Sequence, residues 1–171
     1  MDRESPTTRS ADDREIIVTI SSQRLTLLNH KEPEREYLVS TARNGAGERI
    51  DSGCTPRGRH RVRLVIGRQC PLNTVFVGRR ATGEIYSDAL AHGQPKRDWI
   101  LTRILWLTGA EPGVNRGGEC DTLRRYIYIH GSPDSSPMGR PLSHGCIRMR
   151  NRDIVELSEL VPPGTPVTIE E

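Results

Sequence analysis

The 171-residue chain contains no long apolar segment, either near its N-terminus or elsewhere. A membrane-spanning helix needs about 18 or more consecutive apolar residues, so the sequence predicts no membrane partner. Residues 1–14 are charged and lack the apolar core of a signal peptide, and we expect them to form a flexible tail on a cytoplasmic protein. If a leader had been removed from this sequence, the same pattern would be expected of a periplasmic protein.

Net charge, aromatic side chains and paired cysteines are also scarce. The formal net charge of +3 is too small to predict a nucleic-acid partner, because such binding needs clustered phosphate contacts. Aromatic residues make up 4% of the chain, so Ile, Leu and Val must form most of the core. The four cysteines form no C-x-x-C pair and no export signal precedes them, so we expect reduced thiols.

Short alternating patterns predict a single, mainly β domain over residues 15–171. The predicted strands lie in 15–30 (a hairpin), 36–43, 55–67, 97–109, 123–131, 143–150 and 165–169. Residues 67–97 are mostly polar and are expected to be irregular. Asn151 is predicted to cap a helix that ends before the Pro-Pro-Gly of 162–164. These elements predict two packed sheets with one flanking C-terminal helix.

The segment RPLSHGCIRMRN, residues 140–151, carries the candidate chemistry. A free cysteine is mostly protonated at neutral pH, so a nucleophilic Cys146 needs a base within hydrogen-bonding reach. His144 would share a face of an extended strand with Cys146, and His130 ends the preceding predicted strand. The residues alone leave both histidines open as the base.

Two neighbours of the cysteine fit a site built around a thiol nucleophile. Gly145 has no Cβ, so a substrate can approach closely and the surrounding amides can face a developing oxyanion. Arg148 would lie on the same strand face as Cys146, where it could bind a substrate carboxylate.

A buried, unreactive cysteine and a zinc site are the alternatives. Cysteine is among the most buried residue types, and we expect core packing for three of the four: Cys54, Cys70 and Cys120. A zinc site would draw on His130, His144, Cys146 and Cys120, whose spacing matches no common ligand pattern. The remaining histidines are expected at the surface: His30, His60 and His92.

The segments IHGS and RPLSHGCIRMRNRD together resemble the pattern of the L,D-transpeptidase catalytic domain, also called the YkuD-like domain. The matching positions are His130, Gly131, Ser143, His144, Gly145, Cys146, Ile147, Arg148, Met149, Asn151 and Asp153. The resemblance extends upstream to the 16–28 hairpin and to the segments 38–45 and 55–62, and it covers roughly 16–169, with 67–122 poorly matched.

The resemblance implies a β-rich, sandwich-like fold of mixed sheets and a cysteine acyl-enzyme mechanism. Cys146 would attack the bond between an L-centre, typically diaminopimelate, and D-alanine in a peptidoglycan tetrapeptide stem. His130 would be the base, oriented by the Gly131 carbonyl, and backbone amides near His144, Gly145 and Cys146 would form the oxyanion hole. Ser143, His144 and Arg148 would line the substrate site. No metal or organic cofactor is implied, and carbapenem-type inhibitors are expected to acylate the cysteine.

Two outcomes remain open for the acyl-enzyme. Without a signal peptide, the chain resembles family members that trim muropeptides during cell-wall recycling, which favours hydrolysis as an L,D-carboxypeptidase. The alternative is transfer to an amine, which gives 3-3 cross-links or D-amino-acid exchange. A second alternative is a non-catalytic domain that binds peptidoglycan fragments, although the intact His130 and Cys146 argue against it.

Overall fold

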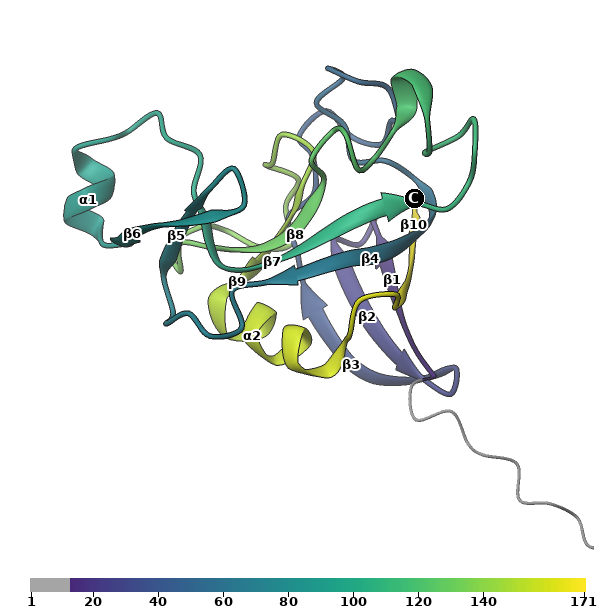
Figure 1. Cartoon of the computed structure of the whole chain (residues 1–171), viewed down its shortest axis with the longest axis horizontal. Coiled ribbons are helices and arrows are strands. Elements are labelled where there is room, and N and C mark those ends of the chain that lie inside the picture. Colours follow the sequence, from purple (N-terminus) through teal and green to yellow (C-terminus); the bar gives the residue numbers. More distant parts are fainter. Residues whose placement is uncertain (1–12) are drawn as a thin grey trace, which may run out of the picture.

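A computed structural model describes residues 13–171 as one curled, mixed ten-stranded sheet with a helix against its concave side (Figure 1). The strand order is β3-β2-β1-β10-β4-β7-β5-β6, and β8 and β9 branch from β7. The strands are β1 (Arg14–Thr19), β2 (Arg24–Asn29), β3 (Glu32–Leu38), β4 (Gly58–Ile66), β5 (Thr74–Val77), β6 (Arg80–Ile85), β7 (Ile100–Gly109), β8 (Tyr128–Ser132), β9 (Ile147–Arg150) and β10 (Pro166–Glu170). The predicted tail lies outside the described residues up to residue 12, and β1 already begins at Arg14.

The mainly β fold with a C-terminal helix is confirmed, and its two layers are parts of one hydrogen-bonded sheet. Alternation builds the first layer, because side chains of a strand point to opposite faces in turn. Ile16 and Val18 of β1 and Leu25 and Leu27 of β2 are fully buried, and the two strands pair antiparallel as the predicted hairpin. The last strand, β10, then pairs in parallel with β1.

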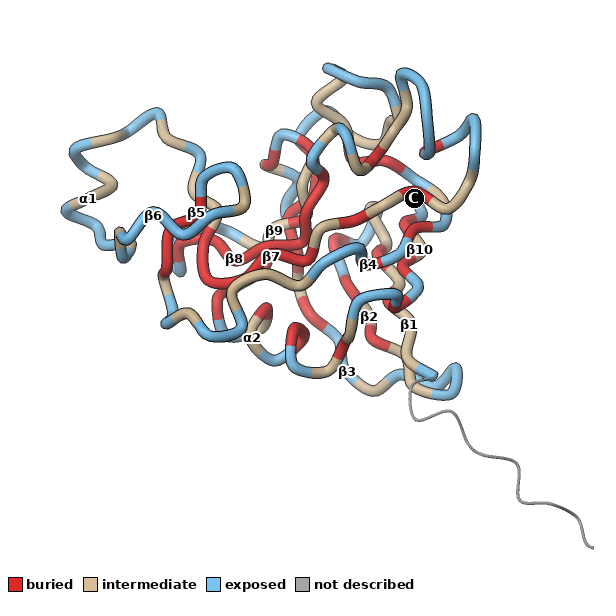
Figure 2. The backbone as a smooth tube through the Cα atoms, in the orientation of Figure 1, coloured by how far each residue is buried: buried red, intermediate tan, exposed pale blue. Residues whose placement is uncertain are grey.

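The core lies between this layer and the strands β7, β8 and β9, where the buried segments gather in Figure 2. Helix α2 (Asn151–Leu160) closes the core from one side and packs on these three strands. Its apolar residues recur at helical spacing, and Ile154, Leu157 and the following Val161 are fully buried. Within residues 13–171, no helix has the length and apolar character needed to cross a membrane.

The sheet around β7 is the part that positions the candidate site. β7 is buried on both faces, as its continuous apolar pattern predicts. It pairs antiparallel with β8, and the pairing shifts between Leu101 and Ile104, so that β7 bulges. Thr102 lies in this bulge with a φ of 75°, which a β-branched residue rarely adopts. β9 then adds in parallel to the other edge of β8.

The structure differs from the sequence prediction in three places. Residues 67–97 are not irregular: they form β5, β6 and the short helix α1 (Asp88–His92), which extend away from the core in Figure 1. The exposed face of β6 left no alternation to detect. The segment 123–127 turns before β8 begins, with Tyr126 at a φ of 55°. Asn151 is the first residue of α2 rather than its cap, and its side chain makes other contacts.

Candidate active site

The parallel pairing of β8 and β9 places the predicted catalytic residues on one face of the sheet. His130 is paired with Arg148, and Ile129 with Ile147. Ile129 and Ile147 face the main core, so alternation turns His130 and Arg148 to the opposite face. Cys146 precedes the strand, but it packs against Tyr128, which lies on this same face two residues before His130. The sheet register therefore brings together residues from the two predicted motifs.

Cys146 packs against a small apolar cluster of Phe76, Ile104 and Tyr128. The amide of Tyr128 donates to its sulfur at 3.3 Å, and the thiol donates to the Tyr126 carbonyl at 3.4 Å. Burial raises the pKa of the Cys146 thiol to about 11, with the Tyr128 amide acting in the opposite direction. At neutral pH the free site therefore holds a protonated thiol, which needs a base to react.

His130 is 1% exposed and is held in a defined tautomer. Its Nδ1 lies 2.6 Å from the Gly131 carbonyl oxygen, which can only accept, so Nδ1 carries the proton and Nε2 is the basic nitrogen. Burial lowers the pKa of His130, which keeps the ring neutral at pH 7. Among the described residues no hydrogen bond occupies Nε2, so this nitrogen is available to a reacting group.

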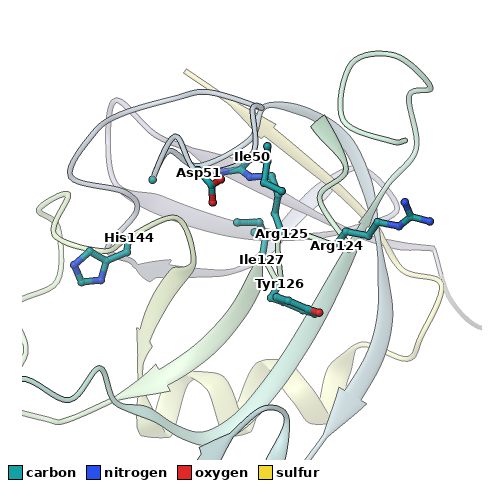
Figure 3. Close-up of a pocket in the computed structure, with 8 residues that line it drawn as sticks. Ile50, Asp51, Arg124, Arg125, Tyr126, Ile127 and His144 are labelled. Atoms are coloured by element: carbon teal, nitrogen blue, oxygen red, sulfur yellow. The ribbon is translucent and has the colours of Figure 1, made fainter. Parts of the chain in front are cut away.

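The other candidate base lies elsewhere. The expectation that His144 and Cys146 share the face of a regular strand is wrong, because residues 143–146 form a bend and β9 begins only at Ile147. Gly145 has a φ of 137°, and a Cβ there would come within 3.2 Å of the Ile127 side chain. The His144 side chain is 71% exposed, and in Figure 3 it lies apart from the side chains of Ile127 and Tyr126. This geometry favours His130 as the base.

The bend is braced by Ser143, which is 2% exposed. Its hydroxyl donates to the Cys146 carbonyl at 2.5 Å and accepts from the Gly145 amide at 3.2 Å. Within residues 13–171 the amides of His144 and Cys146 have no acceptor, so they can donate to an oxyanion. Ser143 shapes the loop that presents these donors, and its contact with substrate stays a prediction.

Behind the base, Asn151 and Thr102 form a support that the sequence did not reveal. Thr102 Oγ1 donates to Asn151 Oδ1 at 2.6 Å, and the Asn151 amide reaches Asn73 and Asp134. A Cβ at Gly131 would lie 2.5 Å from the Leu101 carbonyl and 2.6 Å from Asn151 Oδ1, so only glycine fits here. Asn151 is one of the positions that match the family pattern, but its place before the helical segment predicted a helix cap and not a contact behind His130.

Arg148 is mostly buried and makes an ion pair that was also not anticipated. Its Nη2 atom lies 3.0 Å from Asp98 Oδ1, and Asp98 Oδ2 lies 3.7 Å from His144 Nδ1. Asp98 stands outside every motif, in the segment before β7, so no sequence signal marked it.

A cavity of about 470 Å³ opens beside the cysteine (Figure 3). Tyr126, whose carbonyl contacts Cys146, lines it together with Ile50, Asp51, Gly53, Arg124, Arg125, Ile127 and His144. The guanidinium of Arg125 donates to the carbonyls of Gly47 and Cys54, and burial lowers its pKa. The cavity thus places positive charge next to the reactive face.

The remaining predictions for cysteines and histidines are only partly met. Among residues 13–171 no group of three or more His, Cys, Asp or Glu side chains is placed to hold a metal ion, which leaves the zinc alternative without a ligand set. Cys54, Cys70 and Cys120 are free and half-buried, and of these three Cys70 packs against the apolar cluster of Phe76, Ile104 and Tyr128. The surface prediction is wrong for His60, which is 1% exposed because both ring nitrogens are satisfied inside the protein.

Comparison with known proteins identifies the family of the chain. The profile of the YkuD family, the L,D-transpeptidase catalytic domain, matches residues 13–169. YkuD of Bacillus licheniformis is 48% identical over 59 residues, which cover 34% of this chain and 36% of that protein. The probable L,D-transpeptidase YbiS of Escherichia coli is 31% identical over 110 residues, which cover 60% of this chain and 33% of that protein. The chain thus spans about a third of the length of these curated relatives.

A structural relative extends the similarity to nearly the whole chain. L,D-transpeptidase 3 from Mycobacterium tuberculosis, in complex with a faropenem-derived adduct, superposes with a TM-score of 0.57 at 17% identity. The superposition covers 93% of this chain and 60% of that one, and it supports the shared fold. With a family profile that matches residues 13–169 and a fold to match, the chain belongs to the YkuD family of L,D-transpeptidase catalytic domains.

Proposed function

We propose that the protein is a cysteine acyl-transfer enzyme that cleaves the bond between an L-centre and D-alanine in peptidoglycan tetrapeptide stems. One observation carries this proposal: His130, fixed as a neutral base by the Gly131 carbonyl, lies on the same sheet face as the protonated thiol of Cys146. Membership of the YkuD family supports the choice of substrate.

The reaction follows from the two protonation states. As the Cys146 sulfur attacks the carbonyl carbon, its proton passes to Nε2 of His130, and the oxyanion accepts from the free amides of His144 and Cys146. His130 then gives that proton to the departing D-alanine amine, which leaves a thioester on the sulfur. Transfer starts from neutral groups, so no buried ion has to exist before substrate binds.

We further propose that water is the usual acceptor, so that the enzyme acts as an L,D-carboxypeptidase on soluble muropeptides of the kind released in cell-wall recycling. His130 takes a proton from water, the hydroxyl adds to the thioester, and the tripeptide acid departs from the regenerated thiol. The exposed lining of the adjoining cavity, including Ile50 and Tyr126, supports access of water to the thioester.

Transfer to an amine is the second candidate. An incoming amine would lose its proton to His130 in the same way, and the exposed Asp51 in the cavity lining offers a partner for an ammonium group. The chemistry up to the thioester is common to both outcomes, so the acceptor has to be determined by product analysis. A third candidate, binding of fragments without catalysis, predicts no product at all.

Incubation with a disaccharide tetrapeptide, with and without excess D-methionine, separates these outcomes. We expect release of D-alanine and a tripeptide product, with little D-methionine incorporated. Dominant incorporation would replace hydrolysis by exchange. Cys146→Ala should abolish both products, whereas Cys120→Ala, at a half-buried cysteine of the 3-10 helix Gly118–Cys120, should retain activity. Activity that persists in Cys146→Ala would refute the nucleophile.

Acylation by β-lactams tests the nucleophile without peptidoglycan. The Mycobacterium tuberculosis relative carries a faropenem-derived adduct, and we expect a carbapenem or faropenem to add its mass to Cys146 here. Peptide mapping after incubation should place the adduct on Cys146 in the wild type and in Cys120→Ala. An unmodified mass after prolonged incubation would count against the proposal.

A further inference from the structure

Asp98 lies on an exposed arm that reaches back to the active-site face. We define the arm as residues 86–99, which contain α1 and precede β7. No residue of α1 is buried. The arm is held at its base by an edge-to-face contact between Tyr86 and Trp99 and by an ion pair of 2.7 Å between Arg97 and Glu84. These contacts fix the two ends of the arm and bring Asp98 to Arg148.

The carboxylate of Asp98 joins two residues that flank the nucleophile. One oxygen lies 3.0 Å from the Arg148 guanidinium, and the other lies 3.7 Å from His144 Nδ1. Arg148 is 17% exposed and is the partner of His130 across the strand pair, whereas Asp98 is 51% exposed. An ion pair with one well-solvated partner is weak, so a competing carboxylate can replace Asp98 at little cost.

A second observation indicates that the space beside the ion pair of Asp98 and Arg148 can bind a ligand. A cleft of about 140 Å³ adjoins the ion pair and is lined by Arg97, Asp98, Trp99, Ser132, Pro133, Ser136 and Arg148. Ser132 follows His130 on the same face of β8 and is 1% exposed, yet its hydroxyl has no hydrogen-bond partner within the described residues. A buried hydroxyl without a partner is unfavourable, and a carboxylate oxygen in the cleft would supply an acceptor.

We propose that in the free enzyme Asp98 occupies the position beside Arg148 that a carboxylate of the substrate takes in the complex. The substrate would displace Asp98 when it binds. The inference rests on the proposed function in one respect, namely that the incoming group is the α-carboxylate of the terminal D-alanine. His130 protonates the amine of this residue, and the carboxylate is one carbon away from that amine. Arg148 is paired with His130 across β8 and β9, so it is the neighbouring cation on this face for that carboxylate.

Asp98 thereby sets specificity through competition. A peptide that ends in a free carboxylate forms an ion pair with Arg148, which compensates for the lost ion pair between Asp98 and Arg148. An amidated peptide forms no such ion pair and gains nothing from displacing Asp98. If Asp98 holds the subsite for most of the time in the free enzyme, its removal increases the fraction of the competent form and lowers the apparent dissociation constant in proportion.

The first test compares two peptides on Asp98→Asn and on Asp88→Asn, a matched charge change on the same arm. For a tetrapeptide that ends in D-alanine, Asp98→Asn should lower KM about three- to ten-fold with little change in kcat. For the same peptide ending in D-alaninamide, KM should stay within about two-fold. Asp88→Asn should change neither value. An equal shift for both peptides, or an unchanged or raised KM for the acid, would overturn the proposal.

The second test needs no turnover of peptidoglycan. Iodoacetate carries a carboxylate and iodoacetamide does not, so the ratio of their alkylation rates at Cys146, followed by peptide mass, reports the subsite. Asp98→Asn should raise this ratio several-fold, Asp88→Asn should not, and the double variant Asp98→Asn with Arg148→Gln should lose the gain. A ratio unchanged by Asp98→Asn, or a gain kept without Arg148, would refute the subsite.

The two tests distinguish the two proposals. If the ratio responds but no tetrapeptide is cleaved, the subsite stands and the proposed reaction fails. If the tetrapeptide is cleaved but neither the ratio nor KM responds, the reaction stands and the role of Asp98 fails.

Discussion

Two buried histidines occupy comparable positions in the sheet, yet only one of them can act as a base. His60 of β4 and His130 of β8 are each 1% exposed, and each presents Nδ1 to a backbone carbonyl, that of Gly58 at 2.9 Å and that of Gly131 at 2.6 Å. Both rings are kept neutral by burial, which lowers the pKa of each. Burial and tautomer therefore do not tell them apart.

The second ring nitrogen makes the difference. Nε2 of His60 accepts from Thr122 Oγ1 at 3.0 Å. Both ring nitrogens of His60 therefore have hydrogen-bond partners inside the protein, and the ring has a structural role. Nε2 of His130 has no such partner among the described residues, and the residue lies on the sheet face against which Cys146 packs. A buried histidine is thus a structural residue or a base according to whether its unprotonated nitrogen is already occupied.

The largest expected effect is on activity. His130→Gln should lower kcat/KM for D-alanine release by roughly 10²- to 10⁴-fold, because general-base assistance is lost. His60→Gln should keep kcat within a few-fold, since its ring does not reach the site. The assay is product release from the tetrapeptide, with far-UV circular dichroism to show that both variants fold. A comparable loss of kcat in the two variants would contradict the assignment of His130 as the base and His60 as a structural residue.

The thiol of Cys146 should show its raised pKa directly. With a pKa of about 11, Cys146 is protonated from pH 7 to 9.5, and its alkylation by iodoacetamide should rise about tenfold for each pH unit in that range. Peptide mass spectrometry at several pH values measures the rate for this cysteine separately. A rate that levels off near pH 7 would indicate a thiolate already present in the free enzyme.

His60 should instead govern acid stability. Its pKa is about 4 in the folded protein and about 6.5 in the unfolded chain, so only the unfolded chain gains a proton as pH falls from 6.5 to 4. The free energy of unfolding should fall by about 3 kcal/mol over this window from His60 alone, and the loss should level off below pH 4. Urea unfolding of His60→Gln should lack this component. An identical pH dependence in the variant and the wild type would contradict it.

The smallest effect should come from the partner of His60. Thr122 is fully buried, so Thr122→Val keeps its shape but leaves Nε2 of His60 without a donor. We expect a loss of about 1 kcal/mol in the free energy of unfolding, measured in urea at pH 7. Thr122→Ser, which keeps the hydroxyl, should lose less, and activity should be unchanged in both variants.

The sequence predicts this molecule well where the information is local. Alternation identified the first hairpin, β4, β7 and the last strand, and helical spacing identified α2, because burial of one face leaves a period in the chain. The resemblance supplied Cys146 and His130 together. The polar contacts are different in kind: Thr122 with His60, Thr102 with Asn151, and Asp98 with Arg148 each join distant segments.

Such contacts leave no period and no motif, so the sequence could not reveal them. His60 looked exposed because it stands in an amphipathic strand, and only the fold brings Thr122 over it. The bend at Gly145 is a similar case. An extended backbone was the simplest expectation for residues 143–150, and a single glycine with a φ of 137° redirected His144 away from Cys146.

The pairing of the first and last strands has a mechanical consequence. β1 and β10 run in parallel, with Ile16 opposite Val167 and Thr19 opposite Glu170. A force that pulls on the two chain ends therefore acts along these strands in opposite directions. It loads their hydrogen bonds together in shear instead of opening them one after another, as it would in a hairpin. The domain should resist stretching from its ends far better than its modest size suggests.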